Sequence, residues 1–78
     1  MTTQAELENQ IAALIESIVF TKVTPDQPLL ESGLIDSVTT VEVMLAVEAH
    51  FHCTIPATEV AIHLESVRTM AAYIAARQ

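Results

Sequence analysis

The chain has 78 residues, about half of them hydrophobic (51%) and only three aromatic, with ten acidic residues against three basic ones. This length allows one domain, expected to span residues 1–78, and a core too small for the deep cleft of a self-contained enzyme. The net charge of −7 argues against nucleic acid and anionic membranes and favours partners with basic patches. No signal peptide and no apolar run of membrane-spanning length are recognisable. The single cysteine, Cys53, fits a reducing cytoplasm, which is the expected location.

The first predicted element is a helix over Gln4–Val19. Apolar residues recur along it at helical spacing, and Thr3 with Glu6 matches a capping box at its start. A long loop, Phe20–Asp36, is expected to follow, because its two prolines break any helix.

Within this loop, the only glycine of the chain, Gly33, predicts a turn with positive φ. Leu29 and Leu30 are expected to tether the loop to the core. Loops of this length are uncommon in small domains and are often functional, so the loop directs attention to the residues that follow it.

The second helix is expected to begin at Asp36 or Ser37 and to continue to about Phe51. Steps of 100° per residue place an apolar arc on one side and a mildly acidic arc on the other. Glu48 falls within the apolar arc and is predicted to reach the rim of the core. The predicted buried arc comprises Val41, Val43, Met44, Val47 and Phe51, and the predicted exposed arc comprises Thr39, Glu42, Ala46 and His50.

A short helix over Ala57–Ile62 is predicted after Pro56, and Ser66 can cap a last helix. The fold class is therefore all-α, a small bundle of three main helices and one short helix. The apolar stripe of the last helix comprises Val67, Met70, Ala71, Ile74 and Ala75, and a joint core is expected from Leu14, Val47, Phe51 and Ile74.

Asp36-Ser37 stands at the junction between the long loop and the second helix, as either a plain helix cap or an attachment point. Catalysis by the serine would need a histidine within hydrogen-bond reach. His50 lies roughly 20 Å away along the helix axis, which argues against a hydrolase. The cluster of His50, His52 and Cys53 lacks a fourth ligand for zinc and is interpreted as a solvated helix end.

The run from Leu29 to Val38, Leu-Leu-Glu-Ser-Gly-Leu-Ile-Asp-Ser-Val, resembles the attachment motif of acyl carrier and peptidyl carrier proteins. In that family an Asp-Ser followed by a hydrophobic residue bears 4′-phosphopantetheine. The similarity extends over nearly the whole chain, and length, acidity and helix count agree with it. Positions that match carrier proteins beyond the motif are Val41, Glu42, Glu48, Phe51, Ile55, Pro56, Val67, Tyr73 and Ile74.

The motif is most similar to that of D-alanyl and other free-standing aminoacyl carriers. It lacks the Leu-Gly-x-Asp-Ser form common in fatty-acid carriers and the Gly-Gly-x-Ser form of most peptide-synthetase carriers. Thr39, Ala49 and His50 stand where fatty-acid carriers continue with acidic residues. Docking to the standard enzymes of fatty-acid synthesis is therefore not expected.

The resemblance implies a non-catalytic carrier with 4′-phosphopantetheine on Ser37, aided by Asp36, and with a cargo held as a thioester. Its implied partners are a phosphopantetheinyl transferase, an adenylating ligase or acyltransferase that loads the arm, and a downstream acyl-accepting enzyme. Val38, Glu42 and Met44 are the candidate partner contacts, and a monomer without bound metal is expected. The alternative is a small helical adaptor without a prosthetic group.

Overall fold

A computed structural model describes residues 3–77, and over this range the regular elements are all helices. In chain order they are α1 (Gln4–Val19), α2 (Ser37–Phe51), the 3₁₀ helix η1 (Ala57–Glu59), α3 (Val60–His63) and α4 (Val67–Ala75). The all-α fold class and the order of the predicted helices are thereby confirmed. Within residues 3–77, no helix combines the length and apolar composition that crossing a bilayer requires.

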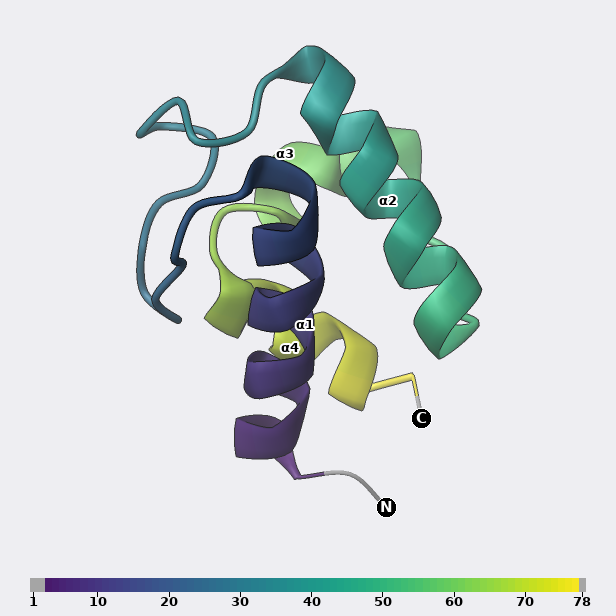
Figure 1. The fold of residues 1–78 in the computed structure, drawn as a ribbon. Coiled ribbons are helices and arrows are strands. Elements are labelled where there is room, and N and C mark those ends of the chain that lie inside the picture. The colour runs from purple at the N-terminus through teal and green to yellow at the C-terminus, as the bar shows by residue number, and fades with distance from the viewer. Residues whose placement is uncertain (1–2, 78) are drawn as a thin grey trace.

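α1 is the central helix of the bundle and packs against both α4 and α2 (Figure 1). Its bounds are those predicted, and Thr3 caps it by accepting a hydrogen bond from the Glu6 backbone N–H at 3.1 Å. The Thr3 hydroxyl donates in turn to the Glu6 carboxylate, which ties the first turn together. The fully buried residues of α1 recur every fourth position and form one stripe: Leu7, Ile11 and Ile15.

The long loop between α1 and α2 runs down one side of the bundle and returns to its top, where α2 begins (Figure 1). Leu29 is fully buried within it and Leu30 is partly buried, so the predicted tether is confirmed. Gly33 has φ of +79°, the left-handed conformation that glycine adopts without strain.

In α2, several side chains face a different direction from the one predicted. Val41, predicted to be buried, is exposed, and Glu48 is exposed rather than placed at the rim of the core. Conversely, Thr39 and Ala46, assigned to the exposed arc, are partly buried. The reason is that α2 carries apolar residues on all sides, so hydrophobicity alone does not fix which side faces the core.

The rest of the predicted core is partly correct. Val47 and Ile74 are buried, but Leu14 and Phe51 are only partly buried and pack against the edge of the core. The predicted short helix is split into η1 and α3, and Ser66 caps α4 by accepting from the Thr69 N–H at 3.1 Å. The buried residues of α4 are Val67, Met70, Ala71, Tyr73 and Ile74.

The inner face of α2 contains one buried hydroxyl without a hydrogen-bond partner among the described residues, that of Thr40. Because an unsatisfied buried hydroxyl is costly, Thr40→Val should raise the free energy of unfolding by about 1 kcal/mol. Thr39→Val is the matched control: it removes a hydroxyl that donates to Asp36 at 3.0 Å and should lower stability. Urea denaturation followed by circular dichroism measures both, and a less stable Thr40→Val variant would contradict the prediction.

Candidate functional site

Ser37 is the first residue of α2 and is exposed to solvent. The capping role belongs to Asp36, whose carboxylate accepts from the backbone N–H groups of Val38 at 3.1 Å and Thr39 at 2.9 Å. It also accepts from the Thr39 hydroxyl at 3.0 Å. Within residues 3–77 the Ser37 hydroxyl has no hydrogen-bond partner, so the helix begins without using it. Asp36 is therefore the helix cap, and the Ser37 hydroxyl is left available for attachment.

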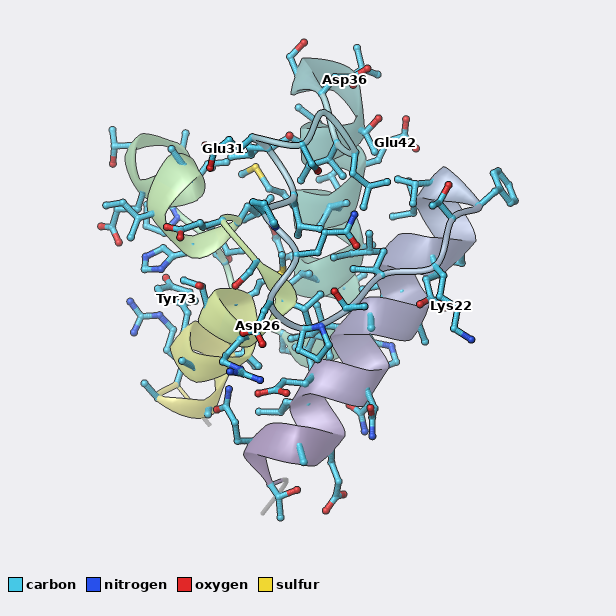
Figure 2. The ribbon with its side chains drawn as sticks, turned by 90° about the vertical axis from the view of Figure 1, so that its left-hand side faces the viewer. Lys22, Asp26, Glu31, Asp36, Glu42 and Tyr73 are labelled. Carbon is cyan, nitrogen blue, oxygen red and sulfur yellow. The ribbon has the colours of Figure 1, made fainter. Side chains whose placement is uncertain are left out.

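The loop brings Ser37 to this position through a compact turn. Ser32 N–H donates to the Pro28 carbonyl at 3.1 Å, and Gly33 N–H donates to the Leu30 carbonyl at 3.1 Å. Ile35, which is buried, closes the turn two residues before Ser37. Figure 2 shows the result: Asp36 lies at the extreme end of the bundle, at the top of α2.

The surroundings of the Asp36 carboxyl favour its ionised form. The hydrogen bonds from the backbone and the hydroxyl of Thr39 hold the pKa of Asp36 below its usual value of 3.8. The N-terminal end of a helix also favours negative charge, so the ionised carboxylate is the form that stabilises the start of α2.

Acid should therefore weaken the cap. Because the pKa of Asp36 is lower in the folded state, its stabilisation is complete above the unfolded-state pKa. It is lost as the pH falls from about 4 through the folded-state pKa. We compare the chain with Asp36→Asn, which keeps a capping oxygen but has no charge. Their difference in Tm should be constant from pH 7 to about 5 and shrink below that; a difference unchanged down to pH 2 would contradict a charged cap.

Next to Ser37, α2 exposes a face that is more apolar than predicted. Val38, Val41 and Leu45 expose 67%, 54% and 62% of their surface, and Glu42 is also exposed. We call these four residues the outer face of α2. Val38 and Glu42 were candidate contacts from the sequence; Met44 was another, but its side chain is partly buried against the core. Val41 and Leu45 were not predicted as contacts from the sequence; the signal available for them was their spacing of three and seven residues from Val38, which places all three on one side of the helix.

The other chemically active side chains lie elsewhere. His50 and His52 are exposed at the C-terminal end of α2, the opposite end from Ser37. His63 contacts Glu59, with Nε2 and Oε1 2.8 Å apart, and its ring lies against Tyr73 with centroids 3.9 Å apart. Among residues 3–77, no group of three or more potential ligands could hold a metal, and no pocket is found.

The fold and the site define a small helical domain that presents one free serine at the start of a long helix. The chain belongs to the phosphopantetheine attachment site family, which matches residues 9–74. It is also similar to the D-alanyl carrier protein of Bacillus licheniformis, with 50% identity over 38 residues that cover 49% of each chain. The chain thus spans about half the length of this curated relative. No solved structure matches it.

Family membership indicates 4′-phosphopantetheine as the covalently attached cofactor. The start of α2 fits such a group: the Ser37 hydroxyl is exposed and unbonded, and a helix N-terminus favours the negative charge of a phosphodiester. Because Asp36 supplies the cap, modification of Ser37 would not remove a hydrogen bond from the helix.

Proposed function

We propose that Ser37 accepts 4′-phosphopantetheine from coenzyme A and that the chain then carries an acyl or aminoacyl group between partner enzymes. The observation that carries this proposal is the free Ser37 hydroxyl beside a cap supplied by Asp36. When bound, the arm supplies a terminal thiol that holds the cargo as a thioester. Tethering raises the local concentration of the cargo at each partner.

The chain itself contributes position rather than catalysis in this proposal. His50 lies near the far end of α2, roughly 20 Å along the axis from Ser37, so it cannot act as the base for the serine. The proton of the Ser37 hydroxyl must therefore be removed by the transferase. Coenzyme A and a buried free Cys53 are both consistent with action in the cytoplasm.

Similarity to a D-alanyl carrier protein favours an aminoacyl cargo. The partners would then be a phosphopantetheinyl transferase, a ligase that adenylates the amino acid and loads the arm, and an enzyme that accepts the aminoacyl group. An acyl group loaded by an acyltransferase is the second candidate, because the shared family alone does not distinguish the cargo.

Intact-mass spectrometry tests the proposed function. The purified chain is incubated with coenzyme A, magnesium and a broad-specificity transferase, and one phosphopantetheine per chain is expected. A matching ligase, ATP and D-alanine should then add one alanyl group that hydroxylamine releases. No gain of mass in the first step would favour the adaptor alternative; a gain followed by failure with every amino acid would favour an acyl cargo.

We propose that partners dock on the outer face of α2. Glu42 would be the charged contact, and Val38, Val41 and Leu45 would be the apolar contacts. Complementary charge mainly speeds encounter, and an exposed ion pair changes affinity by up to about fivefold. Glu42→Lys adds repulsion, so kcat/KM of the loading ligase should fall by more than about fivefold at low salt. The loss should shrink at high salt.

Ala49→Lys is the control: Ala49 is exposed on the same side of α2, four residues beyond Leu45, and its substitution introduces the same cation without removing a charged contact. It should reduce kcat/KM less than Glu42→Lys does, and circular dichroism should show both variants folded. Equal losses would indicate that general electrostatics guides docking. No loss in either variant would place recognition on the loop at residues 21–35 or on α3.

A further inference from the structure

Arg68, in the first turn of α4, joins three segments of the chain. Its backbone N–H donates to the Pro25 carbonyl at 3.0 Å, and its Nη1 lies 2.9 Å from Asp26 Oδ1. Its Nε lies 3.8 Å from Glu8 Oε2, and its carbonyl accepts from Gln4 Nε2 at 3.3 Å. One residue of α4 therefore contacts both the middle of the long loop and the first turns of α1.

A chain of backbone hydrogen bonds connects the start of α4 with the proposed modification site. Leu29 N–H donates to the Glu65 carbonyl, just before α4, at 2.8 Å. The Leu29 carbonyl accepts in turn from the N–H of Ile35 at 3.2 Å. Both side chains are buried, and Ile35 immediately precedes the capping Asp36. Figure 2 shows the span: Asp26 lies low, beside α4 and α1, whereas Asp36 lies at the top of α2.

Two of the four contacts of Arg68 are made by its guanidinium and depend on the side chain, whereas the contacts with Pro25 and Gln4 are made by its backbone. The chain has ten acidic residues and three basic ones, and within residues 3–77 Arg68 is the only lysine or arginine that pairs with carboxylates. Removing its side chain would leave the carboxylates of Glu8 and Asp26, both of which it contacts, with no cation between them. Like charges repel, so the middle of the loop should move away from α4 and α1.

We propose that Arg68 is a positioning residue for the modification of Ser37. It holds the loop at Pro25 and Asp26 against α4, which allows Leu29 to fix Ile35 and thereby the start of α2. This inference rests on the proposed function. Without Arg68, fewer molecules present Ser37 in the geometry that the transferase binds, and apparent affinity falls in proportion to that fraction. The KM for the carrier should therefore rise while kcat at saturation stays the same.

The experiment measures transferase kinetics with coenzyme A on the full chain and on three variants. Arg68→Ala should raise the KM by at most about fivefold, the upper limit for the loss of an exposed ion pair, with kcat within about twofold. Arg68→Lys keeps a cation near Asp26 and should restore most of the loss. Arg77→Ala removes the same charge from a side chain that lies over the Tyr73 ring, away from the loop, and should match the unmodified sequence.

Hydrogen exchange adds a readout that a general loss of stability would not produce. In Arg68→Ala the amides of Leu29 and Ile35 should exchange faster, while those of Ile11 and Val43 in the helical core should not. If Arg68→Ala does not fold, Asp26→Asn leaves α4 intact. It removes the ion pair with Arg68 without leaving two unpaired carboxylates, so it should also raise the KM, by a smaller factor. An unchanged KM in the folded variant, or an equal rise in Arg77→Ala, would overturn the proposal; failure to modify the unmutated chain would instead refute the proposed function.

Discussion

Ser37→Ala should abolish the addition of phosphopantetheine and leave the fold intact. The hydroxyl is the nucleophile at the proposed site, and alanine offers no substitute. Stability should change by no more than about 0.5 kcal/mol, because Ser37 is exposed and Asp36 supplies the cap. Intact mass after incubation with coenzyme A and a transferase measures modification, and thermal unfolding measures stability.

The matched control is Ser32→Ala, which removes another exposed hydroxyl five residues earlier in the same motif. The Ser32 hydroxyl contacts the Leu29 carbonyl and the Leu34 N–H only at 3.4 Å, so its loss should be tolerated. Ser32→Ala should gain the full mass of one arm. A gain of mass in Ser37→Ala would show that another residue is modified and would remove Ser37 from the site.

Ile11→Ala should be the most destabilising of the substitutions considered. Ile11 is fully buried at the middle of α1, the helix that packs against both α2 and α4. Removing a buried isoleucine side chain costs about 2–5 kcal/mol. Domains of this kind have only about 5–15 kcal/mol of stability, so the variant should lose a large part of it. Urea denaturation followed by circular dichroism gives the change directly.

Leu14→Ala provides the comparison, since Leu14 lies on the same helix but is only partly buried. The cost of truncation depends on the buried surface and the cavity that is left, so Leu14→Ala should cost clearly less than Ile11→Ala. The same argument applies to Phe51, which was expected in the core but is only partly buried. A larger loss from Leu14→Ala than from Ile11→Ala would contradict the packing described for α1.

Local signals predicted most of the fold. Helix starts were predicted because a capping side chain bonds a backbone N–H only two or three residues later, which is a local pattern. Thr3 caps α1, Asp36 caps α2 and Ser66 caps α4. The bounds of α1 were predicted closely, because a capping box marks its start and its buried residues recur at helical spacing. Ser37 was proposed as the attachment residue from the loop, the glycine and the motif around it, all of which are contiguous in sequence.

The errors on α2 arose because its orientation is set by contacts with distant parts of the chain. Because valines, one leucine and one methionine are spread around α2, its apolar pattern fits more than one orientation toward the core, and the choice depends on the helices packed against it. Val41 was therefore placed inside and Glu48 was drawn toward the core with it. The pairing of Arg68 with Asp26 also had no local signal, since the residues are 42 positions apart (68 − 26) and nine other acidic residues compete.

The burial of Cys53 has a consequence for the stability of a loaded cargo. Only 6% of this residue is exposed, and burial raises the pKa of its thiol, so it remains protonated and shielded. Thiolates, not thiols, attack thioesters and disulfides. Cys53 lies just beyond the far end of α2, a helix about 22 Å long that begins at Ser37. If Ser37 carries a thioester on its arm, a buried and protonated Cys53 should therefore neither take the acyl group by exchange between sulfurs nor form an internal disulfide with the arm.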